Sequence, residues 1–258
     1  MKKRLLAVLL VVVMAIAVVV PAAAFSVNQQ NTADALNGLG LFQGRGGTAG
    51  YALDANLTRA EGMALLIRMI GKEEETKANT YTTPFVDVPD WAEGYVGYAY
   101  TNGITDGMGP NTFGPSVQLS DNMFLTLVLR ALGYSDKGEK SEFTWDKPYE
   151  LAKKVGLVSS TVADKSFTRG DAVIIFWNAL NAKLVGEDVT LAQSLIKQGI
   201  FTAEQFAEAG VIQKLGMDDV LETDDDLLPS ISDKLPEIPS LGDPGGEGPP
   251  ELEEDVFE

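Results

Sequence analysis

Three segments of the chain repeat the same pattern of apolar and polar positions, with the spacing of a helix that buries one face. The segments LTRAEGMALLIRMIGK, LSDNMFLTLVLRALGY and FTRGDAVIIFWNALNA align without gaps, at residues 57–72, 119–134 and 167–182. A sequence that returns to one pattern at intervals is typical of repeat architectures. The pattern therefore predicts three equivalent long helices.

Both ends of these segments carry helix start and stop signals. A Ser or Thr stands at each N-cap position, and a Gly or Asn, which tolerates the left-handed conformation, follows each last turn. These residues are Thr58, Ser120 and Thr168 at the starts and Gly71, Gly133 and Asn181 at the ends. Glu61 and Asp171 lie three residues after their N-caps. Each predicts a capping box, in which two otherwise unsatisfied N–H groups are bonded reciprocally.

A shorter helical segment precedes each long one. The segments TADALNGLGLFQG, WAEGYVGYAYTNGITDG and KPYELAKKVGLVSS align on Gly40, Gly103 and Gly156. The connections to the long helices are rich in Gly and Pro and are predicted to be loops. One such helix pair cannot bury its apolar face alone, so the units are expected to pack together. Residues 189–216 predict one or two further helices, which either cap the third unit or pack outside it.

The two terminal regions differ in composition from the repeats. Residues 1–24 combine a basic start, 16 consecutive apolar residues and an A-x-A site, which predicts a cleaved secretory signal peptide; an uncleaved membrane anchor is the alternative. Residues 217–258 hold 15 Asp and Glu against one Lys, so they contribute −14 of the net charge of −17. We predict a disordered acidic tail, with weak calcium binding as the alternative to a solvated, repulsive segment.

The composition limits the kinds of catalytic and metal-binding site that the chain can form. The chain has no Cys and no His, so it lacks the thiol nucleophile, the commonest general base and most zinc ligands. No pair of carboxylates is placed legibly for glycoside hydrolysis. We therefore predict no enzyme activity, catalytic residue, metal or cofactor. The acidic balance also argues against nucleic-acid binding, and an exported chain without Cys fits a bacterial surface.

Arginine occupies the first turn of two predicted long helices, where the helix dipole disfavours a cation. Arg59 and Arg169 therefore need a separate explanation. A guanidinium beside the free N–H groups of a helix start suits a carboxylate or phosphate ligand. The alternative is an ion pair with an acidic loop residue of a neighbouring unit. Trp91 likewise has two interpretations, a stacking surface for a sugar ring or a core anchor between units.

The repeated motifs resemble those of S-layer homology (SLH) domains. The second unit carries FVDVPDWAEGYV, GITDG, TFGP and LRALG, the first carries GLFQG and LTRAE, and the third carries FTRGD. The resemblance covers about residues 30–184. It implies a mainly α fold, in which three helix-loop-helix repeats surround a central three-helix bundle with pseudo-threefold symmetry. The implied repeats span 25–72, 84–136 and 143–184, followed by a helical extension at 185–216.

The same resemblance implies a function. The family binds an anionic secondary cell-wall polysaccharide, often pyruvylated, in grooves between repeats, and so holds exported proteins at the peptidoglycan of the bacterial surface. Polymer contacts would fall to Arg59, Arg169, Asp87 and Trp91. Asp121 stands where the family has Arg, so at most two anion grooves are expected. The alternative function is a surface scaffold whose degenerate grooves make protein contacts; in either case the acidic tail is a candidate site for a further partner.

Overall fold

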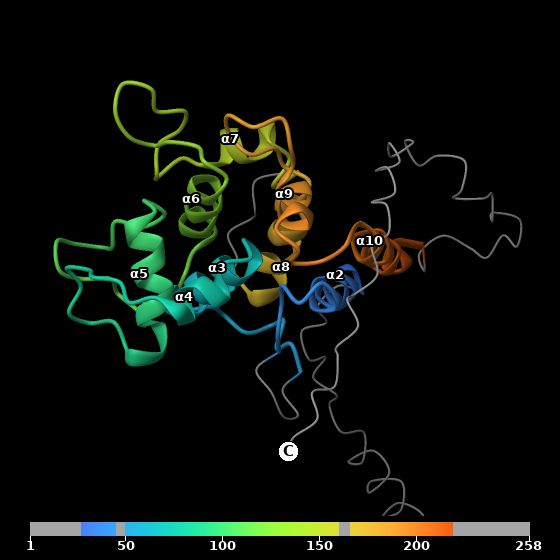
Figure 1. Cartoon of the computed structure of the whole chain (residues 1–258), viewed down its shortest axis with the longest axis horizontal. Coiled ribbons are helices and arrows are strands. Elements are labelled where there is room, and N and C mark those ends of the chain that lie inside the picture. Colours follow the sequence, from blue (N-terminus) through green and yellow to red (C-terminus); the bar gives the residue numbers. More distant parts are fainter. Residues whose placement is uncertain (1–26, 45–49, 160–165, 219–258) are drawn as a thin grey trace, which may run out of the picture. The chain divides into compact units, whose positions relative to one another are not determined.

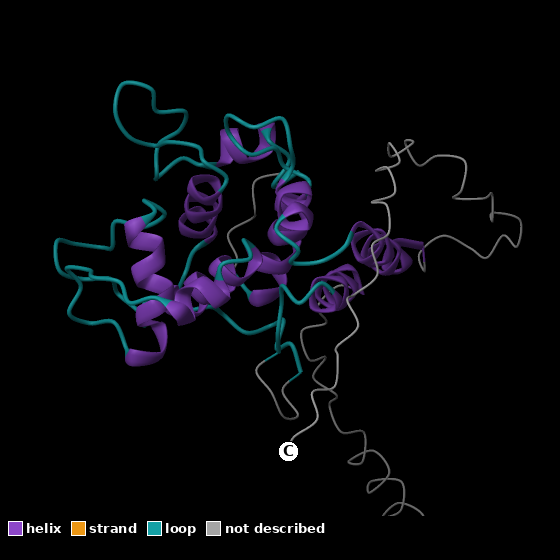
Figure 2. Ribbon diagram, viewed as in Figure 1, coloured by secondary structure: helices purple, strands orange, loops and turns teal. Residues whose placement is uncertain are grey.

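The computed structural model describes residues 27–44, 50–159 and 166–218 (Figure 1), so the predicted signal peptide and nearly all of the predicted tail lie outside the described residues. The described part is mainly helical and contains isolated bridges but no strand (Figure 2). None of its helices has the length and apolar character needed to span a membrane. The elements are α2 Val27–Gly38, α3 Arg59–Met69, α4 Glu73–Ala78, η2 Asp90–Ala92, α5 Glu93–Thr101, α6 Asp121–Ala131, α7 Tyr149–Lys154, α8 Arg169–Leu180, α9 Leu191–Lys197 and α10 Ala203–Asp218.

The three predicted long helices are α3, α6 and α8. Each begins one residue after its predicted N-cap. Helix α6 contacts both α3 and α8. The apolar faces of all three join one buried cluster, which includes Leu66, Val128 and Phe176. The long helices therefore share a core, while their predicted threefold arrangement stays a prediction.

Left-handed glycines end both helices of the predicted units, with one exception. Positive φ angles occur at Gly40, Gly71, Gly103, Gly133 and Gly156. The next N–H then bonds back across the helix end, as from Ile104 N to Ala99 O at 2.8 Å, which is the pattern of a Schellman motif. Asn181 differs, because its φ is −91°. The predicted left-handed end of α8 is therefore wrong, and the chain turns through a bond from Ala182 N to Ala179 O.

The helical extension covers the C-terminal ends of the long helices. Val185 N donates to Leu132 O at the end of α6, at 3.0 Å. The side chains of Leu195 and Ile200 lie against Gly71 at the end of α3, and α9 contacts α8. The extension therefore caps more than the third unit. Its second helix, α10, packs along α2 (Figure 1) and runs two residues past the predicted boundary at 216.

A short helix that the sequence pattern did not predict, α4, is tied to the first long helix by a carboxylate. Glu73 accepts hydrogen bonds from the Arg68 guanidinium at 2.8 and 2.5 Å and from the Tyr95 hydroxyl at 2.8 Å. The hydrogen bond from Arg68 is the largest cause that lowers the pKa of Glu73 to about 2, against the opposing effect of burial. One ionised side chain thus links α3, α4 and α5.

The packing of the extension against α3 can be tested at Gly71. Gly71 and Gly103 have nearly the same φ, +70° and +69°, but a Cβ at Gly71 would lie 2.8 Å from Leu195 Cδ2, whereas a Cβ at Gly103 meets open space. Gly103→Ala should lower the free energy of unfolding by about 1–2 kcal/mol, the cost of the left-handed conformation. Gly71→Ala should cost about 1–3 kcal/mol more through overpacking. Urea denaturation measures both, and equal losses would contradict the packing.

Candidate ligand groove

The first N–H groups of two long helices are bonded to carbonyl groups of a loop from another predicted unit. At α3, Arg59 N donates to Val117 O at 2.9 Å, and Ala60 N donates to Pro115 O at 3.1 Å. The matching bonds at α8 join Arg169 N to Ala55 O at 2.9 Å and Gly170 N to Leu53 O at 2.8 Å. A helix start binds anions through unsatisfied N–H groups. Because these N–H groups are already bonded, the expectation that they offer an anion site is wrong.

The next N–H groups are satisfied by the predicted caps. The capping boxes of Thr58 with Glu61 and of Thr168 with Asp171 are both present. At α6 the cap has one bond instead of two: the Ser120 hydroxyl accepts from Met123 N at 3.2 Å. These helix-capping predictions are confirmed, so Thr58, Glu61, Thr168 and Asp171 have a structural role at the helix starts.

The side chain of Arg59 follows its backbone toward the same loop. Arg59 is 6% exposed, its Nε donates to Phe113 O at 3.0 Å, and its Cζ lies 4.9 Å from the centroid of the Phe113 ring. Burial and then the charge of Arg130 lower the pKa of Arg59, against the opposing charge of Asp87. The terminal nitrogens of Arg59 form no hydrogen bond to any described residue. Its two terminal nitrogens, with four N–H donors, are therefore left for a ligand.

Arg169 makes more use of its guanidinium within the protein. It is 4% exposed, its Nε donates to Tyr51 O and its Nη2 donates to Gln43 O, both at 2.9 Å. Its Cζ lies 5.0 Å from the centroid of the Phe42 ring. Arg169 thus fastens the loop of the first unit. Both arginines thus bond to carbonyl groups of a loop, and Arg59 forms no ion pair with an acidic residue of the described part of the chain.

Asp87 supports the loop that carries the Arg59 contacts. Its Oδ1 accepts from Phe113 N at 2.8 Å, and its Oδ2 accepts from Gly114 N at 2.9 Å. Burial alone would raise the pKa of Asp87, but the backbone hydrogen bonds and the charge of Arg59 outweigh burial and hold the pKa below its ordinary value. Both carboxylate oxygens are therefore engaged in holding the loop.

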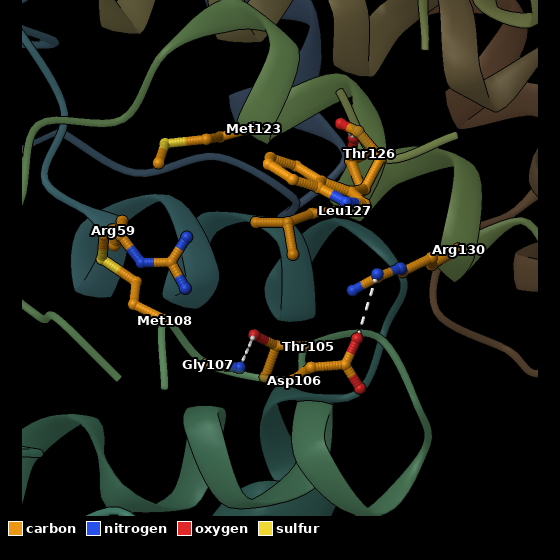
Figure 3. Close-up of a pocket in the computed structure, with 10 residues that line it drawn as sticks. Arg59, Thr105, Asp106, Gly107, Met108, Met123, Thr126, Leu127 and Arg130 are labelled. Atoms are coloured by element: carbon orange, nitrogen blue, oxygen red, sulfur yellow. Dashed lines mark hydrogen bonds and ion pairs between the residues drawn. The ribbon is translucent and has the colours of Figure 1, made fainter. Parts of the chain in front are cut away.

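A cavity of about 350 Å³ opens beside Arg59, between α3, the turn after α5 and the start of the third predicted unit (Figure 3). We call this cavity the Arg59 groove. It is lined by Arg59, by residues 105–108, by Met123, Thr126, Leu127 and Arg130 of α6, and by Trp145. Figure 3 shows the guanidinium of Arg59 pointing into the space between Met108 and Leu127. Two of the predicted site residues, Asp87 and Trp91, do not line it.

The other charges of the Arg59 groove are paired with each other. Arg130 bonds to Asp136 at 2.9 and 2.5 Å and also lies 3.0 Å from Asp106. Asp106 in turn pairs with Lys137 at 2.5 Å. Arg59, by contrast, forms no ion pair with a carboxylate of the described residues. It is therefore the groove cation whose charge is open to an anionic ligand.

The matching surface of the third unit has different chemistry. Asp171, Ile174, Ile175 and Asn178 of α8 align with the four α6 residues of the Arg59 groove, and with residues 156–159 they line a second cavity of about 480 Å³. Asn178 donates to Leu157 O at 3.0 Å, as Arg130 donates to Ile104 O at 3.2 Å. Asp121, in the place of Arg59, accepts a hydrogen bond from the Tyr149 hydroxyl. Among the described residues that line this second cavity, none is Arg or Lys.

The exposure of Trp91 decides whether this side chain is a core anchor between units, which the sequence left open. Trp91 lies in η2 and is 55% exposed, so it is not a buried anchor between units. Trp145 is 67% exposed and lines the Arg59 groove. The sequence analysis did not select Trp145 as a site residue. The available signal was that FTW of the third unit replaces FVD of the second, which puts Trp145 in the place of Asp87.

Comparison with known families matches residues 84–120 to the S-layer homology domain. The chain therefore carries an SLH domain, in the second of the three predicted repeats; repeats one and three stay predictions. It is 30% identical over 71% of its length to a middle cell wall protein of Brevibacillus brevis, 32% over 60% to a cell surface protein of Thermoanaerobacter kivui and 34% over 41% to a surface layer protein of Brevibacillus choshinensis. The chain spans 18%, 21% and 10% of these relatives.

These matches identify an exported protein of the bacterial cell surface and give no indication of a catalytic family. The sequence resemblance to SLH domains is thereby confirmed for the second unit. The mainly helical fold is confirmed as well.

The role of Asp87 predicts a pH-dependent stability. Asp87→Asn should lower the free energy of unfolding by about 1 kcal/mol at pH 7, because one of two charge-assisted acceptors is lost. Since the pKa of Asp87 is lower in the folded state than its ordinary value of 3.8, the carboxylate stabilises fully above that value and loses its effect as the pH falls through the lower folded pKa. Denaturation from neutral to strongly acidic pH should show the two proteins converge. A difference that stays constant with pH would contradict this role.

Proposed function

We propose that this protein anchors itself to the bacterial cell wall by binding an anionic secondary wall polysaccharide in the Arg59 groove. The single observation that carries the proposal is the guanidinium of Arg59. It is buried, it faces a cavity of about 350 Å³, and its terminal nitrogens bond to no described residue. Membership of the cell-surface SLH proteins supports an anchoring role.

The environment of Arg59 favours an acidic group. Its Nε is fixed on Phe113 O and its planar face rests on the Phe113 ring, so little side-chain freedom is lost when a ligand binds. The fork of terminal nitrogens matches the two oxygens of a carboxylate or a phosphate. Because the guanidinium is removed from bulk water, such a bond is stronger than one on an exposed surface.

The repeat architecture belongs to the same proposal. We infer that SLH repeats occupy residues 25–72, 84–136 and 143–184, after a signal peptide at 1–24 and before an acidic tail at 217–258. The same pair of backbone hydrogen bonds forms at the starts of α3 and α8, where each helix meets a loop of another predicted unit. This equivalence supports a repeat in both the first and the third unit. In this arrangement the Arg59 groove lies where the first two units meet the third. Arg169 holds a loop in place, so its contribution to binding is indirect and comes from stabilising the fold.

A surface scaffold that contacts other proteins is the second candidate function. One observation favours it for the third unit, where Asp121 bonds to Tyr149 and the described part of the second cavity's lining holds no cation. We therefore propose one cationic groove, below the upper limit of two that the sequence suggested. A non-catalytic role fits both candidates.

The first experiment is co-sedimentation of the exported protein with purified cell walls of its host. Walls would be used intact and after acid extraction of the secondary polymer. Pelleting with intact walls alone supports polymer binding. Equal pelleting with both preparations would redirect the search to peptidoglycan or a wall protein, and no pelleting with either would favour the scaffold.

Substitution of Arg59 tests the site itself. Arg59→Gln should weaken wall binding by roughly 10- to 100-fold, the effect of losing a charge-assisted hydrogen bond. Arg169→Gln is the matched control, because Arg169 has the same burial and the same Nε bond to a loop carbonyl. It should cost comparable stability but leave binding per folded molecule unchanged. Circular dichroism reports the folded fraction, and equal binding by both variants would exclude the anion role of Arg59.

A further inference from the structure

We propose that the first and last helices of the described chain lock the molecule together. Helix α2 closes a ring of contacts among the three predicted units, and α10 holds α2 in that position. Because this lock needs segments from both ends of the chain, it forms last in folding. The inference concerns how the exported chain folds, and it does not depend on which ligand binds the Arg59 groove.

The short helix of each predicted unit packs on the long helix of another unit. Helix α5 of the second unit contacts α3 of the first, and α7 of the third contacts α6 of the second. Helix α2 of the first unit contacts α8 of the third. The first two contacts join units that are neighbours in sequence. The contact between α2 and α8 joins the first unit to the last, so it is the one that closes the ring.

The contact between α2 and α8 is formed at the start of α8. Gln29 Nε2 of α2 donates to Asp171 Oδ1 at 3.4 Å. A Cβ at Gly170 would lie 2.7 Å from the amide group of Gln29, so α2 approaches the first turn of α8 closely. Gly170 N also bonds to Leu53 O in the loop of the first unit. Two separate segments of the first unit therefore meet the same helix start.

Helix α10 covers both partners of this contact. It lies along α2 (Figure 1), where Gln213 Nε2 donates to Asn28 Oδ1 at 3.1 Å and Ala209 is 3% exposed. It reaches α8 as well, since the ring centroids of Phe206 and Trp177 are 5.8 Å apart. Without α10, the surface of α2 that it covers would face water. Helix α10 therefore acts as a clasp on the closed ring.

The contacts of α2 join the most distant parts of the described chain. Gln29 and Asp171 are 142 positions apart, and Asn28 and Gln213 are 185 positions apart. The entropic cost of closing the intervening chain must be met before such a contact contributes to stability. The contacts between neighbouring units are shorter in sequence. We therefore expect them to form first, and α2 to dock together with α10 afterwards.

Export gives this folding order a consequence. Helix α2 begins at Val27, directly after the predicted signal peptide, so it would cross the membrane before the other described helices. Its partners α8 and α10 lie at residues 169–218 and would cross last. The ring cannot close until nearly all of the described chain has crossed. The first unit thus stays open during passage, when a closed structure would obstruct export.

Pulse-labelling hydrogen exchange during refolding tests the order of these steps. The experiment uses the complete chain without its predicted signal peptide, refolded from urea. Amides of α3 and α6 should gain protection in an early phase, and amides of α2 and α10 should gain it together in the last phase, because they share one interface. Protection of α2 in the same phase as α3 would overturn the proposal.

Substitutions in α10 test the clasp. Ala209→Asp places a charge in the buried interface, and Ala207→Asp is the matched control because Ala207 is exposed on the same helix. Ala209→Asp should lose the last phase and the protection of α2, while α3 and α6 keep theirs. Ala207→Asp should refold as the unchanged protein does. Full protection of α2 in Ala209→Asp would show that α10 does not hold it.

A milder substitution keeps the test decisive if Ala209→Asp does not fold. Gln213→Ala removes the bond to Asn28 and should speed exchange of the α2 amides roughly threefold to tenfold relative to those of α6. Lys214→Ala, at the exposed neighbouring position, is the control and should change neither. Unchanged exchange in α2, or an equal increase in α2 and α6, would overturn the clasp.

Discussion

The structure depends on how the first N–H groups of the long helices are satisfied. A helix leaves four such groups without an internal partner. Here two of them bond to carbonyl groups of a loop from another predicted unit at both α3 and α8, and the N-cap Thr supplies the next acceptor. Leaving these groups buried and unpaired would cost about 1–3 kcal/mol each. The helix of one unit is therefore complete only when the loop of another is in place.

This constraint explains the arginine in the first turn of α3 and α8. Its unfavourable position in the helix dipole is offset by an Nε bond to the same loop and by contact with an aromatic ring. The arginines differ in their terminal nitrogens, because Nη2 of Arg169 reaches Gln43 O, whereas those of Arg59 face the groove. The first-turn arginine thus holds a loop in place at α8, whereas at α3 it both holds a loop and faces the groove.

The local features of the fold were predictable because they depend on residues close in sequence. The two capping boxes, the left-handed Gly71 and Gly133 and the three long helices follow from side-chain spacing alone. Asn181 shows the limit, since Asn tolerates but does not require the left-handed conformation. The site was harder to predict, because Trp145 reaches the Arg59 groove only through the packing of the third unit on α6.

The sequence by itself determined the three long helices, their N-caps and the resemblance of the second unit to SLH domains, because each depends on the spacing of apolar residues and on short motifs. Only the tertiary structure decided what the arginines and Asp87 do. Hydrogen bonds between residues more than 50 positions apart, such as Arg59 with Phe113 and Arg169 with Tyr51, leave no local pattern. The difference between two arginines at equivalent positions of similar motifs therefore arises from the loop that each one meets.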